Sequence, residues 1–244
     1  MMFSKLFFSE IRGRPSDKYR HEFKYEINAL QAEILRNRLS DIMQTDRHSG
    51  ADGIYEVRSL YFDDYSNTCY YENENGTDPR EKFRIRIYNG SDEQIRLELK
   101  RKESGKTLKR SCPITRQQVE ALLSGDMFPW DDAMDPLLKK FYIWSETRIG
   151  RPKIIVNYSR VPFVHPDGNV RVTLDMNICA SADVQSFFRK TFQGRPIMPS
   201  GKHVLEVKFD EFLPDYIAHA VPTYTLSRIT CSKYYLCRKF GGLL

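Results

Sequence analysis

The stretch that decides the fold is Lys-Phe-Arg-Ile-Arg-Ile-Tyr (82–88), followed by Asn-Gly (89–90) and by Ile-Arg-Leu-Glu-Leu-Lys-Arg-Lys (95–102). Apolar and charged residues alternate in both halves, which is the period of a β-strand with one apolar face. An Asn-Gly pair between two such runs is a strong signal for a tight hairpin turn. We therefore predict an antiparallel hairpin whose charged side chains share one face.

The same alternation continues outward along the chain on both sides of this hairpin. Turn signals separate the alternating segments, which predict about eight strands at 20–27, 57–62, 82–88, 94–102, 106–112, 154–162, 170–175 and 203–210. Apolar residues at helical spacing, with candidate capping residues at several starts, predict helices over 28–46, 115–124, 135–146, 182–192 and 227–238.

The charged strand faces allow two interpretations. An ordinary antiparallel sheet exposes such a face to water. Here, however, Arg or Lys recurs at i and i+2 with a single carboxylate among them, in five or more strands. Like charges so placed repel each other unless an anion bridges them. We therefore expect an α+β fold: a closed, mostly antiparallel β-barrel of about eight strands, with a polar lumen that forms a tunnel and with peripheral helices on its apolar outer face.

Composition limits the class of protein. The 244 residues are 41% hydrophobic and 29% charged, which predicts one globular domain over 1–244. The net charge of +6 predicts an anionic partner. The five cysteines have no CxxC or CxxH spacing, which argues against a disulfide framework or a zinc site and favours the cytoplasm. We expect no transmembrane segment and, because the apolar patch in 1–14 is short, no signal peptide.

Six motifs resemble, in order, those of the VTC domain, a member of the triphosphate tunnel metalloenzymes. They are His-Glu-Phe-Lys-Tyr (21–25), Ser-Leu-Tyr-Phe-Asp (59–63), Lys-Phe-Arg-Ile-Arg-Ile-Tyr (82–88), Leu-Glu-Leu-Lys-Arg-Lys (97–102), Val-Leu-Glu-Val-Lys-Phe (204–209) and Ser-Lys-Tyr (232–234). The VTC domain is the polyphosphate polymerase domain of the vacuolar transporter chaperone complex and of stand-alone bacterial relatives. The resemblance covers a core of about 19–238.

This resemblance implies a polyphosphate polymerase, which transfers the γ-phosphoryl group of ATP to a growing inorganic polyphosphate chain. Its partners would be ATP and inorganic polyphosphate, with no nucleic acid, and its cofactor Mg²⁺ or Mn²⁺. The implied catalytic residues are Lys24, Arg84, Arg86 and Lys100, and the implied phosphate ligands are Lys109, Tyr158, Arg160, Arg171, Lys208 and Lys233. The candidate metal ligands are Glu206 above all, then Glu22 and Glu98, although each of these acids could instead pair with a neighbouring Lys or Arg.

One departure from the family pattern bears on the reaction. Hydrolytic members of the superfamily carry Glu-x-Glu-x-Lys on the first strand, whereas this chain has Arg20 in place of the first Glu. The loss of that carboxylate weakens the case for water activation and favours transfer over hydrolysis. Two alternatives stay open: a triphosphatase of the same fold that acts on tripolyphosphate or nucleoside triphosphate, and a non-catalytic protein that binds RNA or another polyanion.

Overall fold

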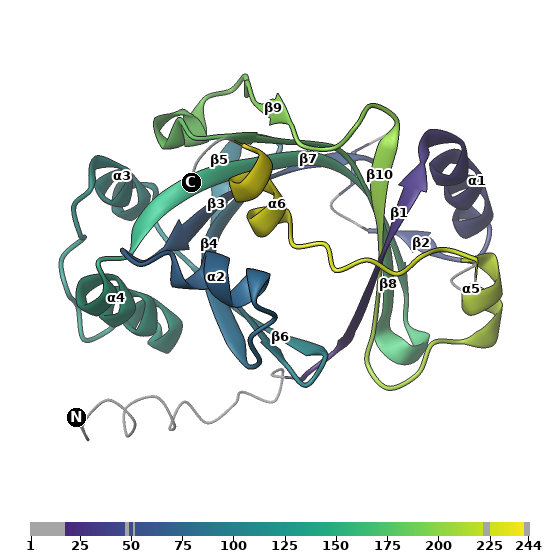
Figure 1. Cartoon of the computed structure of the whole chain (residues 1–244), viewed down its shortest axis with the longest axis horizontal. Coiled ribbons are helices and arrows are strands. Elements are labelled where there is room, and N and C mark those ends of the chain that lie inside the picture. Colours follow the sequence, from purple (N-terminus) through teal and green to yellow (C-terminus); the bar gives the residue numbers. More distant parts are fainter. Residues whose placement is uncertain (1–17, 47–48, 51, 222–224, 242–244) are drawn as a thin grey trace.

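The computed structural model describes residues 18–46, 49–50, 52–221 and 225–241, so the segment 1–14 lies outside it. Its main feature is a curled antiparallel sheet with the strand order β1-β10-β8-β7-β3-β4-β5-β6 (Figure 1). These strands are β1 (His21–Asn28), β3 (Tyr55–Asp63), β4 (Arg80–Tyr88), β5 (Ser91–Glu103), β6 (Lys106–Pro113), β7 (Arg151–His165), β8 (Val170–Ser181) and β10 (Lys202–Phe209). Two short strands extend it, β2 (Gln44–Thr45) beside β7 and β9 (Arg195–Pro196) beside β8.

The helices lie outside the curl or at its opening. They are α1 (Ala29–Ser40), α2 (Thr68–Glu74), α3 (Arg116–Ser124), α4 (Pro136–Arg148), α5 (Asp215–Ala220) and α6 (Lys233–Phe240), with 3-10 turns at Asp167–Asn169 and Val184–Phe188. Figure 1 shows α1 and α5 on one outer side of the sheet and α3 and α4 on the other. Both α2 and α6 border the central opening, and the segment between α5 and α6 crosses in front of it.

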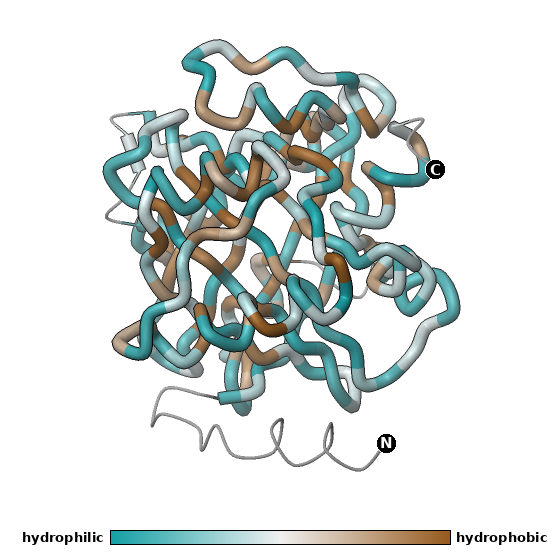
Figure 2. Tube along the Cα trace, turned by 90° about the vertical axis from the view of Figure 1, so that its left-hand side faces the viewer, coloured by the Kyte–Doolittle hydropathy of each residue, from teal (hydrophilic) through white to brown (hydrophobic). Residues whose placement is uncertain are grey.

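The apolar face of the sheet points outward, under these helices. Phe141 of α4 packs edge-on against Phe62 and Phe83, with ring centroids 5.0 and 5.2 Å apart. On the other side, Leu35 and Leu39 of α1 are buried in a cluster with apolar residues of β1, β8 and β10. Because side chains alternate along a strand, this packing turns the charged face inward; Figure 2 shows the resulting alternation of hydrophilic and hydrophobic residues.

The predicted closure of the barrel is wrong, because the structure is an open, curled sheet. Its edge strands β1 and β6 are joined at the bridge between Arg20 and Thr107, where each backbone N–H donates to the other residue's carbonyl at 2.9 Å. Inside the curl, the side chain of Lys100 on β5 reaches Glu22 on β1 at 2.7 Å. An alternating pattern predicts which side chains point inward, but edge pairing involves backbone groups alone and leaves no trace in that pattern.

Two of the predicted helices are confirmed and three need correction. The helices at 115–124 and 135–146 are α3 and α4, each capped by the side chain that precedes it, Thr115 and Asp135. The helix predicted over 28–46 ends at Ser40, because residues 44–45 pair with β7 instead.

The helix predicted over 182–192 is a 3-10 turn at Val184–Phe188. Buried Arg58 donates to the carbonyl oxygens of Phe187 at 3.0 Å and Arg189 at 2.6 Å, so these groups are bonded outside any helix. The helix predicted over 227–238 begins later, because Ser232 is its cap. Among the residues that the structure describes, no helix is long and apolar enough to span a bilayer, and none of the five cysteines forms a disulfide.

Candidate functional site

A pocket of about 430 Å³ lies within the curl of the sheet. Side chains of β1, β3, β4, β5, β6, β7 and β10 line it, together with α2, the start of α6 and the segment 228–232 that precedes α6. Three glutamates reach it, Glu22, Glu74 and Glu206. The cationic side chains in its lining are Lys24, Arg80, Lys82, Arg84, Arg86, Lys100, Lys102, Arg160, Lys208, Arg228 and Lys233. Cations therefore greatly outnumber acids, and the pocket suits an anion of high charge.

Lys24 lies between two carboxylates at the β1–β10 side of the pocket. Its Nζ is 3.1 Å from Oε1 of Glu22 and 3.2 Å from Oε1 of Glu206, and it donates to the backbone carbonyl of Cys231 at 2.7 Å. Burial alone would lower the pKa of Lys24, but Glu22 and Glu206 together raise it above its usual range. Burial likewise would raise the pKa of Glu22, which Lys100 and Lys24 lower. Lys24 and Glu22 are therefore both charged at neutral pH.

Arg84 on β4 is held by a carboxylate from the neighbouring strand. Its Nε and Nη2 lie 2.7 and 2.6 Å from Oε2 of Glu98, and its Nη1 donates to the hydroxyl of Tyr61 at 2.9 Å. Glu98 is buried and does not reach the pocket lining; its Oε1 accepts from the partly exposed Lys109 at 3.2 Å. Glu98 thus fixes the guanidinium of Arg84 from behind.

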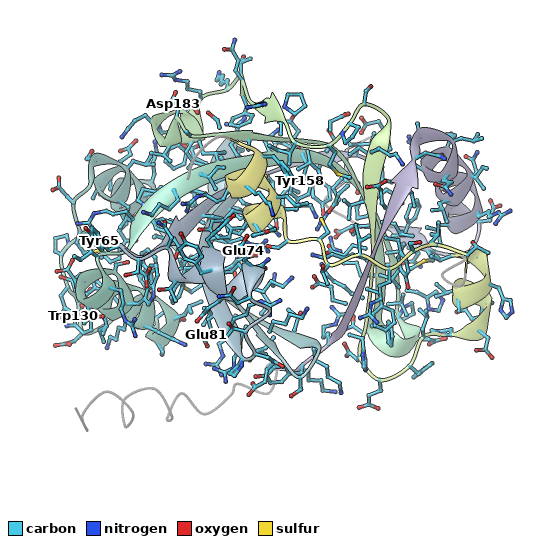
Figure 3. All side chains as sticks on the ribbon, viewed as in Figure 1. Tyr65, Glu74, Glu81, Trp130, Tyr158 and Asp183 are labelled. Atoms are coloured by element: carbon cyan, nitrogen blue, oxygen red, sulfur yellow. The ribbon has the colours of Figure 1, made fainter. Side chains whose placement is uncertain are left out.

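Arg160 and Lys233 share Asp175 as a counter-ion on the opposite wall. Arg160 donates to both oxygens of Asp175, at 2.6 and 2.8 Å, and Lys233 Nζ is 2.5 Å from Oδ2. Both cations also lie over the ring of Tyr158, at 5.2 and 4.9 Å from its centroid. Tyr158 on β7 and Glu74 on α2 lie on the side of the opening that α6 borders (Figure 3).

The structure brings together most of the residues that the sequence singles out. Those in the pocket lining are Lys24, Arg84, Arg86, Lys100, Tyr158, Arg160, Lys208, Lys233, Glu22 and Glu206. Lys109 and Glu98 lie outside that lining, as described above. Arg171 also lies outside it: its Nη2 is 2.7 Å from Oδ2 of Asp46 and donates to the hydroxyl of Tyr55 at 2.9 Å.

Sequence reasoning missed other cations of the lining. Arg80 and Lys82 lie at alternate positions before Arg84, and Lys102 follows Lys100 at the same period, so the strand pattern could have found them. Arg228 lies in an irregular segment, where no periodicity indicates the direction of its side chain.

Lys82 has a different environment from the other lysines of the pocket. Its Nζ donates to Ser232 Oγ at 3.1 Å and to Asn73 Oδ1 at 3.4 Å, and no carboxylate of the described residues lies within ion-pair distance of it. Burial, together with the charge of Lys100, lowers its pKa to about 7. Lys82 therefore titrates near neutral pH.

The acids at the pocket can hold a metal ion with help from a ligand. In the part of the chain that the structure describes, no three Asp, Glu, His or Cys side chains gather in a way that could bind a metal. Glu22 and Glu206 are nevertheless close enough to share the ammonium of Lys24. Mg²⁺ commonly takes one or two carboxylates and completes its shell with substrate phosphates and water. These two acids fit that arrangement.

Solved structures with the same fold come from distant proteins. One, from Bacillus halodurans, is described as a candidate adenylate cyclase; it has 15% identity and a TM-score of 0.52, with 88% of this chain and 95% of that chain covered. Another, from Hippeastrum, is a candidate adenylyl cyclase described as having a dominant triphosphatase activity, with 13% identity, a TM-score of 0.50, and 93% and 97% covered. No curated protein matches the sequence.

The family model of the VTC domain matches residues 19–240. The chain therefore belongs to the VTC domain family.

Proposed function

We propose that this protein is a polyphosphate polymerase, which transfers the γ-phosphoryl group of ATP to the end of an inorganic polyphosphate chain. The observation that carries the proposal is the convergence of Lys24, Arg84, Arg160 and Lys233 on one pocket, from separate elements and each beside a buried acid. Such fixed cations suit phosphoryl transfer, which depends on positioning and charge neutralisation more than on a covalent catalyst.

The chemistry assigned to these residues is electrostatic. An oxygen of the terminal phosphate of the chain attacks the γ-phosphorus of ATP; the bond from that phosphorus to the bridging oxygen breaks, and ADP leaves with the electron pair. Arg84 and Arg86 bind equatorial oxygens of the transferred group, while Lys24 and Lys100 neutralise the charge that develops. No general base is needed, because the attacking phosphate is already an anion.

A divalent ion, Mg²⁺ or Mn²⁺, would be held by Glu206 with Glu22 and by the phosphates of the substrate. When bound, such an ion polarises phosphoryl oxygens and orients them. We further propose that residues 1–244 act as one unit and that the reaction takes place in the cytoplasm, where the five cysteine thiols stay reduced.

A triphosphatase is the second candidate, favoured by the activity described for the Hippeastrum protein of the same fold. The surroundings of Arg20 favour transfer instead. Its guanidinium is 2.7 Å from Asp210 and is absent from the pocket lining, so the position that carries a Glu in hydrolytic members supplies no carboxylate here.

Incubation of the purified protein with ATP and Mn²⁺ tests the proposal. We expect long polyphosphate on a gel, and loss of that product by more than about 100-fold in Lys24→Ala or Arg84→Ala. Lys106→Ala, which removes an exposed cation outside the pocket, serves as the control and should synthesise normally. Release of orthophosphate without chains would instead establish the triphosphatase, and full synthesis by both pocket variants would refute the assigned site.

A further inference from the structure

One corner of the pocket carries a carboxylate that no cation of the pocket neutralises. Glu74, the last residue of α2, lines this corner together with Asn73 and with Tyr235 of α6 (Figure 3). Of the described residues, Lys239 is the one cation within ion-pair distance of Glu74, at 3.9 Å, and it does not line the pocket. The other two glutamates of the lining, by contrast, both contact Lys24.

An acid at this place is unfavourable in the free protein for two reasons. The C-terminal end of a helix carries partial negative charge, which favours cations there over carboxylates. The pocket as a whole suits a highly charged anion, and a carboxylate in its lining repels such a ligand. A ligand group that donates hydrogen bonds to Glu74 would account for its presence.

The free hydrogen-bonding groups of this corner are complementary to a polar group without charge. Oε1 of Glu74 accepts from the hydroxyl of Tyr235 at 3.2 Å, and no donor among the described residues reaches Oε2. Asn73 Oδ1 accepts from Lys82 at 3.4 Å, whereas the amide N–H groups of Asn73 have no acceptor in the described part of the chain. A phosphate chain has acceptor oxygens alone and cannot donate to a carboxylate. The hydroxyls of a sugar can.

We propose that Asn73, Glu74 and Tyr235, hereafter called the nucleoside rim, bind the nucleoside of ATP, and that Glu74 accepts hydrogen bonds from the ribose hydroxyls. This inference rests on the proposed function and adds the part of the pocket that distinguishes a nucleotide from a bare phosphate chain. A carboxylate that accepts from a ribose hydroxyl is the device by which dinucleotide-binding folds hold the sugar.

The position of the nucleoside rim agrees with the structure of ATP. Lys82 is the next inward residue to Arg84 on β4, about 7 Å away along the strand, and its Nζ contacts Asn73. In ATP, two further phosphates separate the γ-phosphate from the ribose. With the γ-phosphate at Arg84, the rest of the triphosphate passes Lys82, and the ribose reaches Glu74.

Removal of the ribose hydroxyls tests the assignment. Binding of ATP, 2′,3′-dideoxy-ATP and tripolyphosphate to the whole chain is measured in EDTA, so that a metal ion held by Glu74 cannot contribute. We expect the wild type to bind ATP about tenfold more tightly than dideoxy-ATP, because the analogue lacks the donors to Glu74. Glu74→Ala should bind the two nucleotides equally, and tripolyphosphate at least as tightly as the wild type does. Glu74→Gln keeps an acceptor oxygen and should retain part of the preference for ATP.

A charge-matched control separates this contact from a general electrostatic effect. Glu93→Ala removes an exposed carboxylate outside the pocket lining and should leave the preference for ATP over dideoxy-ATP unchanged. Equal affinity of the wild type for the two nucleotides would overturn the nucleoside rim. Equal losses for ATP and tripolyphosphate in Glu74→Ala would also overturn it, by showing that Glu74 only joins α2 to α6. Either result leaves the polymerase proposal intact, whereas failure of all three ligands to bind the wild type would overturn the assigned phosphate pocket as well.

Discussion

Two lysines on the same inward face show how single residues are tuned in this pocket. Lys24 lies between Glu22 and Glu206, which raise its pKa, whereas Lys82 faces Lys100 and has its pKa lowered to about 7. The two buried acids therefore keep Lys24 charged at neutral pH. Lys82 can instead gain its proton when an anion arrives.

The titration of Lys82 predicts a pH dependence of binding. Below pH 7 Lys82 is charged in the free protein and the affinity is highest; above pH 7 binding must take up a proton, and the affinity falls by up to about tenfold per pH unit. Lys82→Arg stays charged throughout and should lose this part of the dependence. Isothermal titration of tripolyphosphate from pH 6 to 9 compares the two proteins, so that the ligand's own ionisation cancels; identical profiles would contradict the prediction.

Substitution of Glu206 should change the metal requirement of synthesis more than the affinity for phosphate ligands. Its carboxylate contacts Lys24, Lys208 and Arg160. Because it is a proposed metal ligand, its substitution should affect activity most when the reaction depends on a bound metal ion. Glu206→Gln should raise the Mn²⁺ concentration needed for half-maximal synthesis by about tenfold or more. Binding of tripolyphosphate in EDTA should weaken far less. An unchanged Mn²⁺ titration would remove Glu206 from the metal site.

At the scale of elements, Asp63 connects a strand end to two helices. Its carboxylate accepts from the backbone N–H groups of Cys69 at 2.9 Å and Tyr70 at 3.1 Å at the start of α2, and from the hydroxyl of Tyr234 in α6. Arg238 donates to that same hydroxyl at 2.9 Å. The connection sets the position of α6, and with it the place where Lys233 enters the pocket.

This connection predicts that Tyr234 acts on binding through Lys233. Tyr234→Phe removes the bond to Asp63 and should weaken tripolyphosphate binding by about three- to tenfold. In a double-mutant cycle, the loss should disappear when Lys233 is already Ala, because the group being positioned is gone. Val119→Ala, on the buried face of α3 in a separate apolar cluster, controls for general loosening and should lower Tm without affecting binding. Additive losses in the cycle would show that Tyr234 has a structural role alone.

The sequence predicted elements well where a regular period determined them. Strands β4 and β5 follow from the alternation around Arg84 and Leu97, and α3 follows from its cap and apolar spacing. Helix α2 was missed because its structure depends on a distant carboxylate: its cap residue, Asn67, makes no capping bond, and Asp63 satisfies the free N–H groups instead. Such a contact depends on the fold and has no local signature.

At the scale of the whole molecule, the direction of the charged face was predictable and the path of the sheet edges was not. The packing of Phe83 and Leu97 under α3 and α4 turns Arg84 and Glu98 inward, as the alternation predicts. Arg171 lies at an inward position of β8, opposite Lys208, yet its contacts with Asp46 and Tyr55 keep it out of the pocket. The periodicity predicts which face of the sheet a side chain is on. It does not predict how far along the strand the pocket extends, and that position decides whether an inward cation lines the pocket.

An interior this rich in cations predicts that phosphate ligands stabilise the entire fold. Repulsion among Arg80, Lys82 and Lys102 opposes folding of the free protein, and a polyanion that binds the folded state alone removes it. Tripolyphosphate at 100 times its Kd should add about 2.7 kcal/mol, which raises Tm by roughly 5–10 °C for a chain of this size. Thermal unfolding with tripolyphosphate, or with sodium sulfate at equal ionic strength, measures the effect. Arg84→Ala should lose most of the rise in Tm that tripolyphosphate causes. An equal rise in Tm with sulfate would mean that general charge screening, and not a specific phosphate site, stabilises the fold.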